Sequence, residues 1–150
     1  MNLIPDQPIL TGDQILPYIP QRPPMVFVDT FYGMIDDAQY SSLLVTSDMV
    51  FVENGKLLDI GLIEFLTQSG YVWFSYREKV ILQKSDLEIT KGYLCKIKNV
   101  HVFNTPCVGT RIYSRMDVIF FSTSFCTIHL TAYTEDGTLA EGDFDVISLN

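Results

Sequence analysis

Polar and apolar residues alternate with a period of two through most of the second half of the chain. Four runs of this kind follow one another, each bounded by turn-forming residues: 93–103, 110–121, 124–134 and 139–149. Successive side chains of a β-strand point to opposite faces of a sheet, so the pattern predicts strands with one buried and one solvated face. The turn sequence Glu135-Asp-Gly-Thr separates the last two runs and predicts a hairpin.

The first half of the chain has two further strand signals behind a proline-rich segment. Residues 1–24 contain six of the seven prolines, with room for one short helical turn capped by Thr11. Residues 25–32 are rich in β-forming side chains and residues 33–37 favour a turn. Residues 40–45 then predict the returning strand.

Residues 59–77 have a different pattern, which predicts one long central helix. Asp59 stands where a capping residue is expected, and Glu64 is the single charged residue between positions 60 and 76. Because apolar side chains cover more than one face of this segment, we expect the helix to be buried. Gly61 and Gly70 are small enough for another part of the chain to approach the helix closely.

The predicted order of elements is two strands, one helix and four strands. An antiparallel sheet needs a second layer over its apolar face, and the one long helix is apolar nearly all round. With 150 residues, 47% of them apolar, the chain has the size and the core material of one domain. The sequence therefore predicts a single α+β domain over 1–150, with an antiparallel sheet wrapped around a central helix.

Composition gives no reason to expect a cofactor or a membrane span. Cys95, Cys107 and Cys126 are widely spaced and form no C-x-x-C pair, with only His101 and His129 to join them as metal ligands. We therefore expect no metal site and interpret the cysteines as reduced, small core residues. The chain has no run of roughly 18 apolar residues to span a bilayer and no visible signal peptide, so we expect a cytoplasmic protein.

The net charge of −8 argues against nucleic acid as a partner, because phosphate binding requires a basic surface. The charge is unevenly distributed along the chain, however. Eight of the ten Lys and Arg residues lie in 77–115, with only three acidic residues among them. This stretch is either a solvated face of the protein or a docking surface for an acidic partner.

Several segments together carry a resemblance to a known family. Ile15-Leu-Pro-Tyr-Ile-Pro-Gln-Arg-Pro-Pro is similar to a Leu-Pro-His-Arg-x-Pro motif, with Gln21 in place of the histidine. Gly61-Leu-Ile-Glu-Phe-Leu-Thr-Gln is similar to a helix motif, Gly-x-x-x-Glu-x-x-Ala-Gln. The segment after Gly92, its Pro106-Cys-Val-Gly turn and the ending from Asp136 match in position and character. These motifs resemble the β-hydroxyacyl-acyl-carrier-protein dehydratases (the FabA/FabZ group), which are dimers of hotdog domains.

The segment before the helix departs from that family. The catalytic members have a Gly-His-Phe-Pro-Gly-His-Pro loop there, and it supplies the catalytic histidine. This chain has Val50-Phe-Val-Glu-Asn-Gly-Lys-Leu-Leu-Asp, which contains no histidine. The residue that would remove the C2 proton of the substrate is therefore absent from this position. His101 and His129 are alternative bases only if the fold brings one of them to the helix.

The resemblance implies roles for individual residues. In the family the helix glutamate protonates the leaving C3 hydroxyl of a 3-hydroxyacyl thioester, and Glu64 would take that role. Gln68 is four residues further on the same face and would position Glu64 or the substrate. Desolvation on an apolar helix is expected to raise the pKa of Glu64. The candidate substrate-binding residues are Gly61, Phe51 and Trp73, and the candidate carrier-docking residues are Arg77, Lys79, Lys96, Lys98 and Arg111.

Three functions remain open at this point. The first is a 3-hydroxyacyl thioester dehydratase of fatty-acid or polyene-type biosynthesis, acting on acyl-carrier-protein or CoA substrates. In the family the active site forms across a dimer, so this chain is either a homodimer or the partner of a histidine-bearing hotdog paralogue. The second is a non-catalytic subunit that binds acyl groups or stabilises its partner. The third is a thioesterase in which Glu64 activates water. The aromatic residues Tyr71, Trp73, Phe74 and Tyr76 are interpreted either as core or as the lining of an acyl tunnel.

Overall fold

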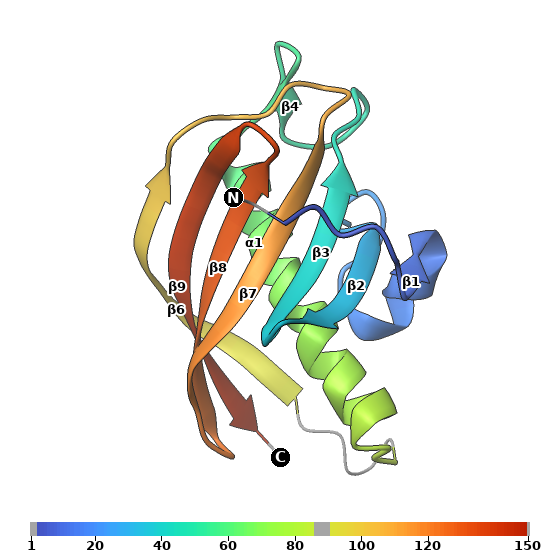
Figure 1. The fold of residues 1–150 in the computed structure, drawn as a ribbon, viewed down its shortest axis with the longest axis vertical. Helices are drawn as coiled ribbons and strands as arrows, with labels where there is room; N and C mark the ends of the chain where they lie inside the picture. Colours follow the sequence, from blue (N-terminus) through green and yellow to red (C-terminus); the bar gives the residue numbers. More distant parts are fainter. Residues whose placement is uncertain (1–2, 86–90, 150) are drawn as a thin grey trace.

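The computed structural model describes residues 3–85 and 91–149, and it places one long helix against an antiparallel sheet (Figure 1). Within these residues the sheet has seven strands in the order β1-β2-β3-β7-β8-β9-β6. The strands of the sheet are β1 (Leu10–Thr11), β2 (Thr30–Ile35), β3 (Ala38–Leu44), β6 (Lys91–Val102), β7 (Arg111–Phe121), β8 (Phe125–Thr134) and β9 (Gly137–Leu149). The predicted α+β arrangement, an antiparallel sheet around one helix, is confirmed.

The other elements connect the strands and lead into the helix. A 3₁₀ helix, η1 (Gly12–Tyr18), follows Thr11 in the proline-rich segment. The long helix is α1 (Asp59–Tyr76), and a short π-helical stretch, η2 (Arg77–Ile81), continues it. A separate two-stranded hairpin of β4 (Val52–Glu53) and β5 (Lys56–Leu57) stands directly before α1.

The core lies between α1 and the inner face of the sheet. Leu62, Phe65 and Val72 of α1 are fully buried against the side chains of the sheet. Along β8 the residues alternate as predicted, with Ile128 and Leu130 in the core and intervening polar residues on the outer face. Each fully buried Leu, Ile or Phe contributes about 1.5–3 kcal/mol by leaving water, so this layer accounts for much of the driving force for folding.

The strand predicted from residue 25 begins only at Thr30. The backbone of Met25 and Phe27 is bound by a helix side chain instead of by a neighbouring strand, as described below. The following turn is tighter than predicted, because Asp36 and Asp37 both have positive φ and close a two-residue hairpin. Gly33, which was expected in that turn, lies in β2 at a shift in register, with φ of 75°.

The hairpin before the helix is fixed by backbone hydrogen bonds. Asn54 and Gly55 have positive φ and form its turn, and the Leu57 N–H donates to the carbonyl oxygen of Pro106 over 3.0 Å. The Leu58 N–H donates to the carbonyl oxygen of Phe51 over 2.8 Å. Leu58, rather than the predicted Asp59, is the capping residue of α1. Asp59 is the first helical residue, where its charge favours the positive end of the helix dipole.

The cysteines only partly follow the prediction of reduced core residues. All three are free thiols, but Cys126 alone is buried, whereas Cys95 and Cys107 are exposed. Within residues 3–85 and 91–149, no group of His, Cys, Asp and Glu is arranged to hold a metal ion. In the same residues, no helix combines the length and the apolar character that a membrane crossing requires.

Candidate active site

Gln68 is at the centre of the candidate site. It is fully buried, and its side-chain oxygen accepts a hydrogen bond of 2.7 Å from the backbone N–H of Phe27. Its amide nitrogen donates to the carbonyl oxygen of Met25 over 2.9 Å and to Glu64 Oε2 over 3.0 Å. Because both ends of the amide are engaged, its orientation is fixed, and it holds the 25–27 segment and the Glu64 carboxylate together.

Glu64 is half-buried, not buried as the sequence predicted. The sheet covers the face of α1 that contains Leu62, Phe65 and Val72, but it leaves another face partly uncovered. This open stripe consists of Ile60, Ile63, Glu64, Thr67, Tyr71 and Phe74, and Ile60 is 52% exposed. The apolar character of the whole helix had indicated burial on all sides, whereas one layer of sheet covers only part of its circumference.

Among the described residues, Glu64 has no cation within ion-pair distance and its Oε1 has no hydrogen-bond partner. Its one recorded side-chain partner is Gln68. The carboxylate is therefore positioned through one oxygen and accessible through the other. That arrangement suits a group that exchanges a proton or orients a water molecule, because a catalytic acid or base must keep an atom free for the reactant.

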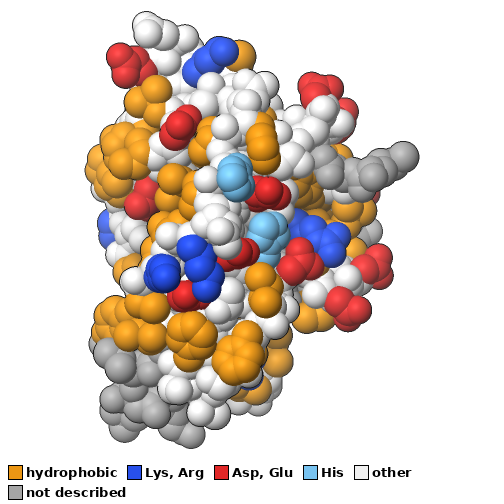
Figure 2. Space-filling view, turned by 90° about the vertical axis from the view of Figure 1, so that its left-hand side faces the viewer, with side chains coloured by type: hydrophobic (Ala, Val, Ile, Leu, Met, Phe, Trp, Pro, Cys, Tyr) orange, Lys and Arg blue, Asp and Glu red, His pale blue; other side chains and the backbone are white. Residues whose placement is uncertain are grey.

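Neither histidine lies on the side of the sheet that faces the helix. His129 is on the outer face of β8, where its Nδ1 is 2.7 Å from Asp143 Oδ1 and its Nε2 is 3.8 Å from Glu141. His101 is opposite Glu141 in the β6–β9 pairing and is exposed. Figure 2 shows both histidines at the surface, among side chains of both charge signs. The sheet separates them from Glu64, so neither serves as its base within one chain.

The three predicted substrate-binding residues are not brought together. Gly61 is one turn before Glu64, but a Cβ there would lie 2.4 Å from a Leu57 side-chain carbon, so it serves close packing of β5 on the helix. Phe51 is in the loop before β4 and stacks on Phe27, with ring centroids 5.6 Å apart. Trp73 is buried on the opposite face of α1, about 13 Å further along the axis from Glu64.

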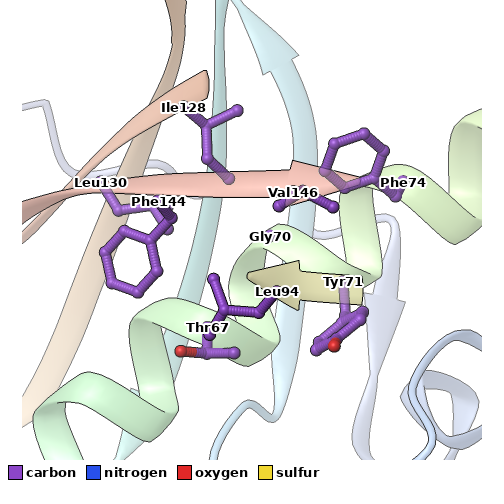
Figure 3. A pocket seen from close by; sticks show the side chains of 9 residues that line it. All are labelled: Thr67, Gly70, Tyr71, Phe74, Leu94, Ile128, Leu130, Phe144 and Val146. Atoms are coloured by element: carbon purple, nitrogen blue, oxygen red, sulfur yellow. The ribbon is translucent and has the colours of Figure 1, made fainter. Parts of the chain in front are cut away.

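A pocket lies beside the open stripe, and the sequence predicted only its helix side. Thr67, Gly70, Tyr71 and Phe74 form its helix side, and five apolar residues of β6, β8 and β9 form the other (Figure 3). The space inside it that a water molecule can enter is about 20 Å³, enough for about one water molecule, so its own side chains nearly fill it. The spacing of Thr67, Tyr71 and Phe74 on one helix face was the available signal. The strand residues come from distant parts of the sequence, so only the folded structure shows that they line the pocket.

The comparison with solved structures identifies the architecture. No protein-family model matches the sequence, and no curated protein matches it either. Among solved structures, the chain is similar to "The Dehydratase Heterocomplex ApeI:P from Xenorhabdus doucetiae", with a TM-score of 0.76 at 18% identity over 91% of both chains. The solved structures that the chain resembles, this one and the two described next, are hotdog proteins. The chain has a hotdog fold.

Two further hotdog neighbours differ in their described roles. One is a hypothetical thioesterase with coenzyme A from Streptococcus pneumoniae, with a TM-score of 0.61 at 11% identity over 80% of this chain and 84% of that one. The other is an uncharacterised protein from Pyrococcus horikoshii, with a TM-score of 0.61 at 14% identity over 85% and 88%. At such identities the likeness establishes the hotdog fold and not the reaction.

The predicted carrier-docking residues are spread over three regions of the hotdog domain. Arg77 and Lys79 are at the end of the helix, where Arg77 lies over the Phe121 ring and Lys79 donates to the carbonyl oxygen of Pro17. Lys96 and Lys98 are on β6, and Lys98 pairs with Asp145 at 3.1 Å. Arg111 begins β7 and is 2.8 Å from Asp29. The acidic residues Asp86 and Glu88 of the same stretch lie outside the described residues.

Proposed function

We propose that this chain is a dehydratase-like subunit that acts on 3-hydroxyacyl thioesters and supplies Glu64 as the general acid. The observation that carries the proposal is the Glu64–Gln68 pair, in which a buried amide holds a carboxylate that keeps one oxygen free. The pair lies one turn before an apolar pocket on the open stripe. The hotdog fold and the dehydratase heterocomplex among its structural neighbours support the same class of reaction.

The elimination requires two groups. A base takes the C2 proton of the substrate, and the electron pair of that C–H bond forms the C2–C3 double bond. The C3–O bond then breaks, and the leaving hydroxyl takes a proton from Glu64 and departs as water. Gln68 Nε2 holds Oε2, which leaves Oε1 to face the C3 hydroxyl. Glu64 recovers its proton from solvent or from the base before the next turnover.

The base is expected to come from a second subunit. Among the described residues, both histidines are on the outer face of the sheet. In the described part of the chain, strand β6 is at the edge of the sheet and has β9 as its one neighbour, so its other edge is open to a partner strand. Leu94 of β6 also lines the pocket beside the open stripe, so a subunit that docks on β6 would approach Glu64. A histidine-bearing hotdog paralogue fits this requirement, since this chain supplies no histidine of its own there.

The test is the elimination of water from a 3-hydroxyacyl thioester by this chain, by a histidine-bearing hotdog protein and by their mixture. We expect the mixture to gain activity and Glu64→Gln in this chain to lower the gained rate by about 10²–10⁴-fold. Glu53→Gln is the matched control, because Glu53 is an exposed carboxylate of the hairpin before the helix and should leave the rate unchanged.

Two results would argue against a catalytic role for Glu64. A mixture that gains no activity would remove the basis for a composite site. A mixture whose activity survives Glu64→Gln would instead identify this chain as a subunit that stabilises its partner or binds acyl groups. Size-exclusion chromatography of the same mixtures records whether the two chains assemble.

A thioesterase is the second candidate, and the half-exposure of Glu64 favours it. A carboxylate with one oxygen accessible to solvent can orient and activate water without a histidine, and one structural neighbour is a hypothetical thioesterase with coenzyme A. Release of free thiol from acyl-CoA by this chain alone, abolished in Glu64→Ala, would favour hydrolysis over dehydration.

A further inference from the structure

The end of strand β7 exposes four large apolar side chains in a row. Val118, Ile119, Phe120 and Phe121 are 44%, 59%, 54% and 43% exposed. The segment 118–126, which includes the turn into β8, contains no charged residue. Single exposed apolar residues are common on protein surfaces, but a contiguous group of large ones marks a site of interaction with another apolar surface.

The exposed side chains lie on both faces of the β7–β8 hairpin. Phe121 is on the inner face, where its ring centroid is 6.3 Å from that of Trp73. Phe120 is on the outer face beside Phe125, with ring centroids 6.1 Å apart. A protein that packs on one face of a sheet contacts alternate residues of a strand. A lipid interface surrounds the end of a hairpin, so exposed apolar residues on both faces favour lipid over a flat protein surface.

The helix brings positive charge to the same end of the molecule. The Arg77 guanidinium lies over the Phe121 ring, 4.8 Å from its centroid. Residues 77–85 contain three basic residues and one acid, Glu78, whose carboxylate is buried and paired with Lys84. Ile81 of η2 is 61% exposed nearby in the sequence. In Figure 1 the β7–β8 turn and the end of the helix both lie at the lower end, where Figure 2 shows hydrophobic side chains next to Lys and Arg.

The turn between β7 and β8 satisfies its own polar groups. The Ser122 N–H donates to the carbonyl oxygen of Phe125 over 2.8 Å, and the Phe125 N–H donates to Ser122 Oγ over 3.2 Å. The Ser122 hydroxyl donates in turn to the Phe125 carbonyl oxygen over 2.9 Å. Backbone groups without partners are strongly unfavourable in an apolar medium, and this turn can leave water with these groups paired.

We propose that the β7–β8 hairpin end docks this protein on an anionic lipid surface, with residues 118–121 in the apolar boundary of the membrane and Arg77 beside the lipid phosphates. Proteins that bind a membrane surface without crossing it combine apolar side chains that enter the boundary with basic residues that attract anionic headgroups. Strand β9 lies between β8 and the edge strand β6, so this docking leaves the proposed partner edge free. The inference is independent of the proposed reaction.

The test is flotation of the full chain with vesicles of phosphatidylcholine, with and without phosphatidylserine. We expect binding to the anionic vesicles. Arg77→Gln should weaken it about fivefold, the usual effect of one basic residue at such a surface. The double variant Ile119→Ser, Phe120→Ser should weaken it at least tenfold, because it removes two apolar side chains from the boundary. Phe103→Ser is the matched control at a ring that is 60% exposed at the opposite end of the sheet, and it should bind like the wild type.

Circular dichroism establishes that each variant is folded, and Phe120→Ser alone gives the same comparison if the double variant is not. The inference is overturned if the chain binds neither kind of vesicle, or if the folded double variant binds as well as the wild type, which would be adsorption by charge alone. It is also overturned if sedimentation shows a wild-type dimer that the double variant lacks, which would assign the hairpin end to a contact between two copies. Loss of vesicle binding on assembly with a histidine-bearing hotdog protein would assign it to that partner instead.

Discussion

Gln68 connects two parts of the molecule that would otherwise be separate. Its amide replaces the strand partners that Met25 and Phe27 lack, and it also orients the Glu64 carboxylate. A side chain of this kind has both a structural and a positioning role, because it binds a buried backbone N–H, a part-buried backbone carbonyl and a carboxylate. The structural part is measurable without any substrate.

Gln68→Leu is expected to lower the free energy of unfolding by about 2–4 kcal/mol. The change leaves the buried Phe27 N–H and the half-buried Met25 carbonyl without their partner, and each unpaired buried group costs about 1–3 kcal/mol. Urea denaturation followed by circular dichroism measures the difference. Gln7→Leu is the control at an exposed glutamine, and a loss no larger than that of the control would contradict the role assigned to Gln68.

At the scale of the elements, the outer face of β6, β8 and β9 includes a group of paired polar side chains that contrasts with the core beneath it. Asp145 of β9 accepts a hydrogen bond of 2.7 Å from Thr127 and pairs with Lys98 at 3.1 Å. The hydrogen bond from Thr127 and then the contacts with Lys98 lower the pKa of Asp145, against the opposing effect of burial. Hydrogen bonds from Asn99 and His129 likewise lower the pKa of Asp143. Charges across neighbouring strands therefore hold this face together.

These two carboxylates are expected to make the fold sensitive to acid. A carboxyl group whose folded pKa is below its ordinary value of 3.8 stabilises the fold above that value, and the contribution is lost as the pH falls from 3.8 through the folded value. Asp145→Asn should lower stability by about 1–2 kcal/mol near neutral pH and flatten the loss at low pH. Urea unfolding over a pH series measures both effects. Asp117→Asn removes a more exposed ion pair and should change little; equal pH profiles for Asp145→Asn and the wild type would contradict the assignment.

The periodicity of the sequence predicted these elements. The prediction failed where a side chain, and not a neighbouring strand, binds the backbone. The period-two runs and the apolar segment predicted the sheet and α1. The start of β2 at Thr30 was not predictable, because it depends on Gln68 reaching 41 residues back along the chain. Glu64 and Gln68 share a helix face by spacing alone, and the structure adds their hydrogen bond. The exposure of Glu64 and the strand side of the pocket depend on how far the sheet extends around the helix.

At the scale of the whole molecule, the proposed partner would cover a sheet edge and part of a helix. The three cysteines report on this assembly because they lie in different environments. Cys95 is exposed on the edge strand β6, Cys107 is exposed in the loop before β7, and Cys126 is buried. Burial, with a smaller contribution from the charge of Asp145, raises the pKa of the Cys126 thiol to about 11.

Alkylation at neutral pH, read by mass spectrometry, is expected to modify Cys95 and Cys107 in the isolated chain and to spare Cys126, because the thiolate is the reactive form. When the partner is bound along β6, Cys95 should become at least tenfold slower to react while Cys107 stays unchanged. Equal protection of both residues, or of neither in a mixture that has assembled, would place the partner elsewhere on the molecule.

In the proposed composite site, the β4–β5 hairpin stands where this chain would need a histidine to act alone. It occupies the position of the histidine loop in the dehydratases that the sequence resembles. Two backbone hydrogen bonds join it to the 106–108 segment, from the Leu57 N–H to the Pro106 carbonyl oxygen and from the Val108 N–H to the Gly55 carbonyl oxygen. A histidine introduced there by one substitution would lie on a hairpin backbone that follows a different path from that of the family's loop. A chain that supplied both groups would require a new loop of different length and path, so in the proposed composite site the need for a second protein would be hard to reverse by stepwise mutation.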